Sequence, residues 1–198
     1  MKFVTATDNP WKIIEIKKIL SDLGFDIVTR EDLGIDIIID ETGTTFFENA
    51  RLKATAICEI SGLPAIADDS GLIVDALNGE PGVYSSSFGG EALDSVERCE
   101  YLLNKMKKAE QRSAKFVCTI VCAFPNGDLL TESGECNGTI TGEIRGDGRF
   151  GYDPVFIPEG YDKTMAELSL IEKNSISHRG IALKKISVSL KNYEKGTQ

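Results

Sequence analysis

The start of the chain alternates between short apolar runs and a segment with helical spacing. KFVTAT at residues 2–7 and FDIVT at residues 25–29 are typical of strands. Between them, the apolar residues of NPWKIIEIKKILSDLG (9–24) recur at helical intervals, with Pro10 suited to a first helical turn and Gly24 to a helix end. This order of strand, helix and strand predicts an α/β fold.

The rest of the chain continues the mixture. Helical patterns are expected at 45–62, 92–111 and 178–193. Buried strands are expected at 63–68 and 71–79, a strand edge passing into a loop at 33–45, and a β-meander with a PNGD hairpin turn at 113–144. Gly-rich loops are expected at 79–90 and 145–164. We therefore expect one α/β domain over residues 1–198, built on a mixed sheet and divided into two lobes.

Charge and hydropathy limit the partners. The chain has 22 basic and 31 acidic side chains, a formal charge of −9. Such a protein does not attract nucleic acid or an anionic membrane through its net charge. No apolar run approaches the ~20 residues that cross a bilayer, and the N-terminus does not resemble a signal peptide, so we expect a cytoplasmic protein. An anionic substrate would need locally gathered cations or a divalent metal.

The five cysteines do not form a recognisable zinc or redox motif. No CxxC pair occurs, and a single histidine does not complete a Cys/His zinc site. Cys118 and Cys122 lie in the apolar run FVCTIVCAF, on one face of an expected strand. We expect reduced and mostly buried thiols.

The segment TDNPWK (7–12) joins an expected strand to a helix N-terminus. Backbone N–H groups there favour an anion, and Lys12 adds positive charge one turn into the helix. The alternative is a plain helix cap made by Thr7, Asp8 or Asn9.

The segment ADDSG lies between two expected strands. Adjacent carboxylates of Asp68 and Asp69 at a strand end can hold Mg²⁺ and orient a water molecule, and Glu41 is a plausible third acid. Mutual repulsion should raise the pKa of at least one of the two neighbours. The alternatives are an acidic turn completed by Ser70 and Gly71, and a solvent-exposed loop acid at Glu41.

The loop GRFGYDP carries two aromatic side chains, Phe150 and Tyr152, framed by Gly148 and Gly151. Such residues can stack on a nucleobase, or they can anchor the loop to the core. His178 is either a structural hydrogen-bonding residue or part of a site. A phosphate turn, metal carboxylates, further cations and an aromatic loop together favour a nucleoside triphosphate as ligand.

These motifs resemble, in order, those of the inosine/xanthosine triphosphate (dITP/XTP) pyrophosphatases, which remove deaminated purine nucleotides. The matching segments are TDNPWK, ETGTTFFENARLKA, LPAIADDSGLIVDALNGEPGVYS, FGYDPVF and AEL…EKNSISHRG. The resemblance implies an elongated mixed sheet flanked by helices, with two lobes and a nucleotide-binding cleft between them, and a homodimer. It also implies water attack on the α-phosphorus, giving a nucleoside monophosphate and pyrophosphate.

The resemblance assigns roles to particular residues. Asp69 would be the proton acceptor, and Mg²⁺ would bind Glu41 and Asp69 with Asp68 nearby. The substrate would be bound by Thr7, Asp8, Asn9, Pro10, Trp11, Lys12, Lys53, Ser70, Phe150, Gly151, Tyr152, Asp153, Lys173, His178 and Arg179. In this set the turn holds the triphosphate, the lysines neutralise phosphate charge, the aromatic loop lines the base and sugar, and the His-Arg pair reads the purine edge.

The chain departs from the family pattern at a few positions. Asp8 stands where the family commonly has Gly, Trp11 is bulkier than usual, Arg149 precedes the FGYDP motif, and Ser86-Ser87 replaces Ala-Arg. Three rival functions are an aspartyl-phosphate phosphatase, a septum-type nucleotide pyrophosphatase and a nucleotide-sensing module. The first lacks its D-x-D-x-[TV] loop, the second would not carry EKNSISHR, and the third would bind inosine triphosphate without releasing pyrophosphate.

Overall fold

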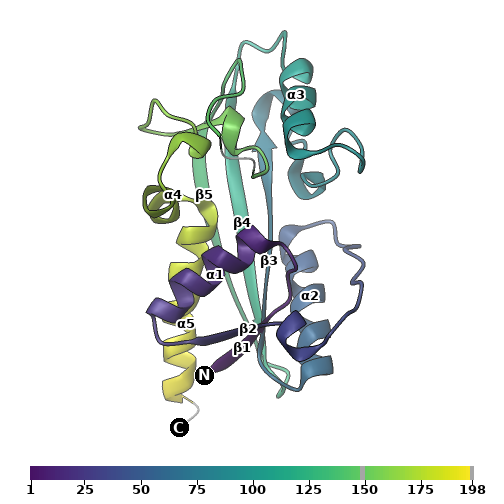
Figure 1. Ribbon diagram of the computed structural model, residues 1–198, viewed down its shortest axis with the longest axis vertical. Coiled ribbons are helices and arrows are strands. Elements are labelled where there is room, and N and C mark those ends of the chain that lie inside the picture. The colour runs from purple at the N-terminus through teal and green to yellow at the C-terminus, as the bar shows by residue number, and fades with distance from the viewer. Residues whose placement is uncertain (148–149, 197–198) are drawn as a thin grey trace. The chain divides into compact units, whose positions relative to one another are not determined.

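The computed structural model describes residues 1–147 and 150–196 (Figure 1). Its six strands form one mixed sheet with the order β2-β1-β3-β4-β5-β6. The strands are β1 (Lys2–Thr5), β2 (Asp26–Thr29), β3 (Ala65–Val74), β4 (Ser113–Ala123), β5 (Leu129–Ile140) and β6 (Phe156–Pro158). The helices are α1 (Pro10–Asp22), α2 (Phe46–Ser61), α3 (Ser95–Lys105), α4 (Leu170–Ile176) and α5 (His178–Gly196). The expected α/β class and mixed sheet are confirmed.

The chain divides into two compact units. Unit 1 contains Met1–Asp69, Cys118–Gly134 and Arg179–Gln198; unit 2 contains Ser70–Val117 and Glu135–His178. Both units therefore take residues from β3, β4 and β5. The expected single domain with two lobes and a cleft stays a prediction.

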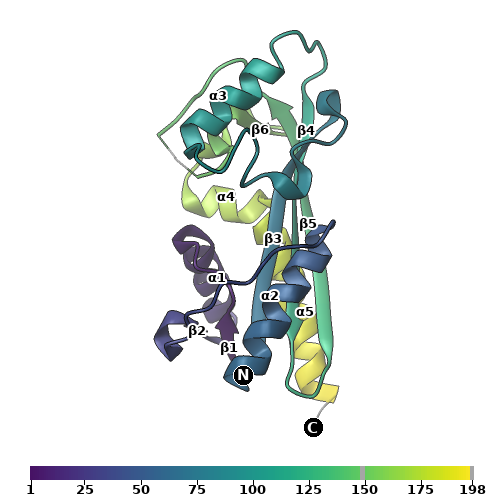
Figure 2. The same cartoon turned by 90° about the vertical axis from the view of Figure 1, so that its right-hand side faces the viewer.

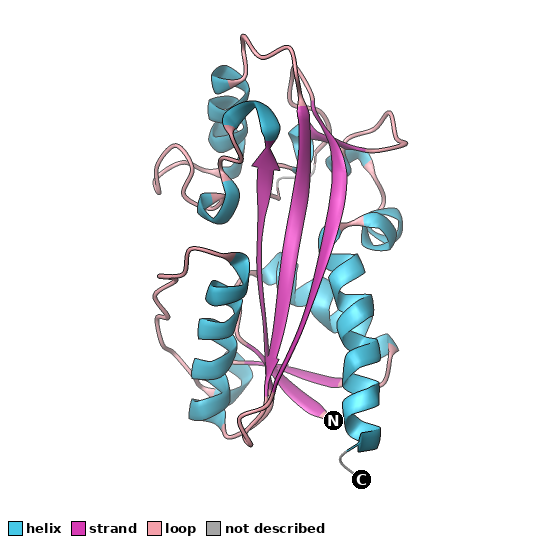
Figure 3. Cartoon of the chain, turned by 180° about the vertical axis from the view of Figure 1, so that it is seen from behind, coloured by secondary structure: helices cyan, strands magenta, loops and turns pink. Residues whose placement is uncertain are grey.

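Unit 1 is a three-layer structure whose strands alternate their side chains between two cores. One core, which we call the α1/α5 core, joins Ile16 of α1 and Leu183 of α5 to Ile66 of β3. The other, the α2 core, joins Ala54 of α2 to Ala67 of β3. Figure 3 shows α2 and α5 on opposite sides of the strands, and Figures 1 and 2 show α1 beside β2.

Unit 2 buries one apolar core. Leu72 of β3, Phe116 of β4 and Ile140 of β5 pack with Leu102 of α3 and with Tyr152 from the aromatic loop. Figure 1 shows α3 at the same end of the sheet strands as this loop region. The core therefore fixes residues 152–156 against the unit-2 part of the sheet.

Helix boundaries follow their capping residues. Asn9 caps α1, and Pro10 occupies its first turn as expected. Thr45 and Glu48 form a capping box at the start of α2, and Gly62 ends that helix in the left-handed conformation. The PNGD turn is confirmed, because Phe124 N donates to the Asp128 carbonyl across it.

Three expectations about elements are wrong. Residues 63–68 and 71–79 do not form two strands around an acidic turn, because β3 runs without a break from Ala65 to Val74. Residues 33–45 contain no strand: Leu33 ends a short 3-10 helix, and residues 35–45 form neither helix nor strand, with Ile35, Ile37 and Ile39 packed on the α2 core. The helix expected at 92–111 is only Ser95–Lys105, capped by Asp94.

All five cysteines are free and buried, as expected. Burial raises the thiol pKa of Cys118 and Cys122 above the ordinary range. Among the helices of the described residues, none is long and apolar enough to cross a bilayer.

Gly138 is a position where β5 and β6 leave no room for a side chain. A Cβ there would lie 2.2 Å from the carbonyl oxygen of Ile157 and 2.6 Å from the ring of Phe156. We expect Gly138→Ala to lower the free energy of unfolding by roughly 1–3 kcal/mol, measured by urea denaturation. Gly142→Ala is the matched control, because no heavy atom lies within 4 Å of its added Cβ. Equal stability of the two variants would contradict the packing described for β6.

Candidate functional site

The two acids of ADDSG lie inside β3, and this placement separates them. Successive residues of a strand point to opposite faces. Asp68 therefore shares the face of Ile66, toward the α1/α5 core, and Asp69 shares the face of Ala67, toward the α2 core. Neighbours in sequence are thus placed in two different environments.

Asp68 is fully buried among cations on the α1/α5 side. Its Oδ2 lies 3.0 Å from Lys12 Nζ and 3.0 Å from Arg179 Nε, and Arg179 donates through Nη1 to Glu15 at 2.6 Å. Arg179 and Glu15 are only 2% and 4% exposed at the side chain. Burial alone would raise the pKa of Asp68, but Lys12 and Arg179 outweigh it and hold this pKa well below its ordinary range. Asp68 is therefore an ionised anchor for two cations.

Asp69 lies on the other face, where it is slightly more exposed than Asp68 and its charge is less fully compensated by cations. Lys53 Nζ is 3.3 Å from Asp69 Oδ1 and 3.0 Å from Glu41 Oε2. Asn49 Nδ2 donates to Asp69 Oδ2 at 3.4 Å. Burial raises the pKa of Asp69 to about 6, against the opposing effect of Lys53 and Lys12. The expected rise in one of the two acids is found, and burial contributes more to it than repulsion by Asp68.

Glu41 reaches this group from residues 35–45, which form neither helix nor strand. Its side chain is 45% exposed, whereas that of Lys53 is 10% exposed. Asn49 also accepts the N–H of Gly43 at 2.8 Å, so one buried amide contacts both Asp69 and the segment that carries Glu41. The carboxylates of two distant segments therefore converge on one ammonium group.

The turn TDNPWK forms a well-defined helix start. Asn9 Oδ1 accepts the N–H groups of Trp11 and Lys12 at 3.0 and 3.3 Å, and Asn9 N donates to Thr7 Oγ1 at 3.2 Å. The capping interpretation is thereby confirmed for Asn9. The Trp11 side chain is 55% exposed. Binding of phosphate at this turn stays a prediction.

The aromatic loop and Lys173 form a second group, within unit 2. Lys173 Nζ lies 2.8 Å from Asp153 Oδ2 and 4.8 Å from the centre of the Phe150 ring. Tyr152 donates its hydroxyl to the Ser85 carbonyl at 2.8 Å and is buried, so the core-anchoring interpretation holds for this ring. Gly151 has a positive φ of 56°, which lets the chain turn between the two aromatics.

His178 is 5% exposed and stacks on Phe116, with ring centres 4.7 Å apart and planes inclined by 13°. A buried ring stacked on a core phenylalanine is typical of a structural histidine. Ser70 follows Asp69 and is half-buried. Gly148 and Arg149 lie outside the described residues.

Sequence analysis missed three residues of the site. Glu15, Asn49 and Arg30 are 3%, 3% and 8% exposed, and each contacts a predicted site residue: Arg179, Asp69 and Asp8 respectively. A signal was present for the first two, because each is a polar residue on the buried face of an amphipathic helix. Arg30 directly follows a strand and had no such signal.

No three His, Cys, Asp or Glu side chains gather as metal ligands anywhere in residues 1–147 and 150–196. Glu41 and Asp69 are two carboxylates that both form ion pairs with Lys53.

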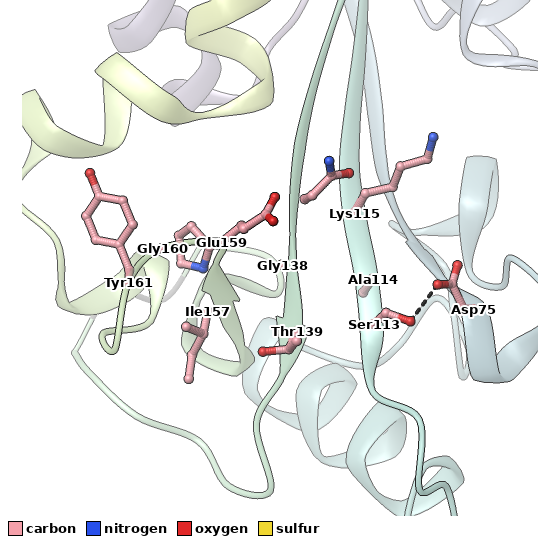
Figure 4. A pocket seen from close by; sticks show the side chains of 12 residues that line it. Asp75, Ser113, Ala114, Lys115, Gly138, Thr139, Ile157, Glu159, Gly160 and Tyr161 are labelled. Atoms are coloured by element: carbon pink, nitrogen blue, oxygen red, sulfur yellow. Dashed lines mark hydrogen bonds between the residues drawn. The ribbon is translucent and has the colours of Figure 1, made fainter.

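Unit 2 also holds a pocket of about 580 Å³, lined by Asp75, Ser113 and Tyr161 among others, where Ser113 Oγ donates to Asp75 at 2.6 Å (Figure 4). None of the predicted site residues lines this pocket.

The fold and the site define an α/β protein whose buried cations and carboxylates suit a phosphorylated ligand. The chain belongs to the Ham1 family, whose family model matches residues 3–188. This match confirms the resemblance found from the motifs.

Its relatives cover almost the whole chain. A dITP/XTP pyrophosphatase of Aquifex aeolicus (strain VF5) is 50% identical over 204 residues, covering 98% of this chain and 99% of the relative. A dITP/XTP pyrophosphatase of Bacillus subtilis (strain 168) is 46% identical over 186 residues, covering 93% and 94%. The solved structure of a HAM1 protein from Coxiella burnetii superposes with a TM-score of 0.89 at 39% identity, covering 97% and 99%.

Asp68 gives a stability test of the buried ion pairs. We expect Asp68→Asn to lower the free energy of unfolding by about 3–5 kcal/mol near pH 7, because Arg179 and Lys12 lose a buried partner. The folded-state pKa of Asp68 is depressed, so its stabilisation is present above the ordinary value of 3.8 and is lost as the pH falls through the folded-state value. The difference from wild type should therefore shrink as the pH is lowered below about 4.

Urea denaturation of both proteins at several pH values measures this difference, with the exposed Asp26→Asn as control. A loss at neutral pH no larger than that of the control would contradict the anchoring role of Asp68.

Proposed function

We propose that this protein hydrolyses deaminated purine nucleoside triphosphates, namely ITP, dITP and XTP, to the nucleoside monophosphate and pyrophosphate. It is a nucleoside triphosphate pyrophosphatase that removes these nucleotides from the cellular pool. The observation that carries the proposal is the buried carboxylate of Asp69 beside Lys53 and Asn49 of α2, next in the strand to Asp68, which anchors Lys12. Membership of the Ham1 family and the names of its relatives support the same chemistry.

Asp69 would accept the proton of the attacking water. A general base works best when its pKa lies close to the working pH, and burial raises the pKa of Asp69 to about 6. Its two oxygens are directed by different donors, Lys53 on Oδ1 and Asn49 on Oδ2. This arrangement limits rotation of the carboxylate before the substrate arrives.

We propose that Glu41 and Asp69 also hold a divalent cation, Mg²⁺. The support is the donor set: two carboxylates share one positive charge at 3.0 and 3.3 Å, and Mg²⁺ is often bound by one or two carboxylates together with substrate phosphates. When bound, the ion would offset phosphate charge and lower the pKa of a coordinated water. Asp68 suits this role less well, because Lys12 and Arg179 already engage it.

The phosphate chain would be bound by cations that carboxylates hold in place. Lys12 is held by Asp68, and Lys53 by Asp69 and Glu41. Because these partners fix the ammonium groups beforehand, little reorganisation is needed when negative charge develops on the leaving pyrophosphate. The helix start after Asn9 would supply backbone N–H groups.

The base and sugar would be bound by the unit-2 group. Phe150, Gly151 and Asp153 remain the proposed lining, with Lys173 fixed by Asp153, while Tyr152 anchors this loop to the core. Hypoxanthine and xanthine carry a carbonyl oxygen at purine position 6, whereas adenine carries an amino group there. Donors facing that position would accept the first two bases and stay unpaired with adenine.

His178 and Arg179 are less exposed than readers of a base edge need to be. Arg179 donates to Asp68 and Glu15, and His178 packs on Phe116. We therefore favour a role for Arg179 in holding Asp68, while purine reading by this pair stays a prediction. A homodimer and a cytoplasmic location are likewise proposed.

Replacement of Asp69 tests the proposed base. We expect Asp69→Asn to reduce kcat for inosine triphosphate at saturating Mg²⁺ by about 100-fold or more, because proton transfer from water is lost. Pyrophosphate release is the measurement, and Asp26→Asn serves as the surface control. Activity of Asp69→Asn within a few-fold of wild type would refute the assignment, because loss of a general base costs about 100-fold or more.

Substrate preference tests the proposed function as a whole. We expect kcat/KM for inosine and xanthosine triphosphates to exceed that for adenosine and guanosine triphosphates by at least about 100-fold. Adenine leaves the donors that face purine position 6 unpaired, whereas guanine shares the carbonyl oxygen there and must be rejected through its 2-amino group. Pyrophosphate release from all four nucleotides is compared under one set of conditions. Equal turnover of the four would leave only a general nucleotide pyrophosphatase.

A further inference from the structure

Arg30 and Asp8 meet because β1 and β2 are parallel neighbours. Thr5 at the end of β1 pairs with Thr29 at the end of β2. The residues that follow two parallel strands emerge at the same edge of a sheet. Asp8 follows β1 within the phosphate turn, and Arg30 directly follows β2. Arg30 Nε lies 2.9 Å from Asp8 Oδ1.

The two partners differ in exposure. The Arg30 side chain is 10% exposed and that of Asp8 is 67% exposed. An ion pair with one partner this exposed contributes little to stability, because solvent screens it. The buried guanidinium therefore has another consequence: it places a fixed positive charge next to the one acid of the turn.

A carbonyl oxygen holds Arg30 in this position. Arg30 donates through Nη2 to the carbonyl of Ile37, and its own carbonyl accepts the N–H of Ile35 at 2.9 Å. Ile35 and Ile37 pack on the α2 core. The guanidinium is thus hydrogen-bonded to a segment whose apolar side chains pack on the α2 core, and a backbone hydrogen bond ties the same segment to Arg30, so its placement does not rest on Asp8 alone.

The sign of the charges makes this pair relevant to an anionic ligand. Asp8 stands between Thr7 and Asn9, in the turn to which the triphosphate is assigned, and an unpaired carboxylate there would repel phosphate. We propose that Arg30 is a positioning residue for the triphosphate, which offsets the charge of Asp8 and so allows this turn to bind phosphate. The inference rests on the proposed function only in naming a triphosphate as the ligand.

The test compares four variants with wild type: Arg30→Gln, Arg30→Lys, Asp8→Asn and the double variant Asp8→Asn/Arg30→Gln. Arg51→Gln is the matched control, because it removes the same charge from an exposed position on α2. The measurements are KM and kcat for inosine triphosphate at saturating Mg²⁺, together with the thermal unfolding midpoint of each protein.

We expect Arg30→Gln to raise KM about tenfold while kcat changes less than about threefold. The lost positive charge weakens binding of the anionic triphosphate and does not act in the chemical step. The double variant should recover a KM within about threefold of wild type, since the acid that needed compensation is gone. Arg30→Lys, which keeps the charge, should lie between wild type and Arg30→Gln. A merely structural role would lower the unfolding midpoint and would not be reversed by Asp8→Asn.

Two results would overturn the inference: a KM for Arg30→Gln equal to that of Arg51→Gln, or a double variant as impaired as Arg30→Gln. If wild type does not hydrolyse inosine triphosphate, the proposed function has failed, and titration calorimetry with inorganic tripolyphosphate decides the inference by itself. Dissociation constants that rise for Arg30→Gln, rise less for Arg30→Lys and return toward wild type in the double variant would support it. Equal constants, or no binding by wild type, would overturn it.

Discussion

Two adjacent carboxylates buried in one strand must each be given a cation, and this requirement organises unit 1. Strand alternation sends Asp68 toward α1 and α5 and Asp69 toward α2. Lys12 comes from α1, Arg179 from α5 and Lys53 from α2. A buried charge without such a partner would be strongly destabilising, so the helices that cover the sheet also supply its electrostatic balance.

The different pairing of the two acids gives them different chemistry. Asp68 meets two cations and stays ionised, so it serves as an anchor. Asp69 shares Lys53 with Glu41, and burial raises its pKa to about 6. One strand therefore carries a fixed negative charge on one face and, on the other, a carboxylate whose pKa lies closer to neutrality. Neither property belongs to an aspartate as such; each follows from the face on which it lies.

Much of the fold could be predicted from local chemistry, because caps and turns act over a few residues. Asn9 was among the three candidate caps of the first helix, and the expected helix 45–62 with its glycine end and the PNGD turn were found where local chemistry placed them. The continuity of β3 was missed, since two acids followed by Ser70 are typical of a turn and are stabilised here by distant partners. Motifs likewise located residues expected to touch a ligand. They did not reveal Glu15, Asn49 or Arg30, which act on other side chains and are identified only by the contacts that the fold creates.

The burial of all five cysteines has a consequence for the chemical durability of the protein. A thiol must ionise and be reached by solvent before it is alkylated or oxidised. Here every thiol is enclosed, and burial raises the pKa of Cys99 to about 12 and that of Cys136 to about 11. Attack by electrophiles and peroxides is therefore governed by how often the structure opens. The folded chain protects its own sulfur atoms without needing a disulfide.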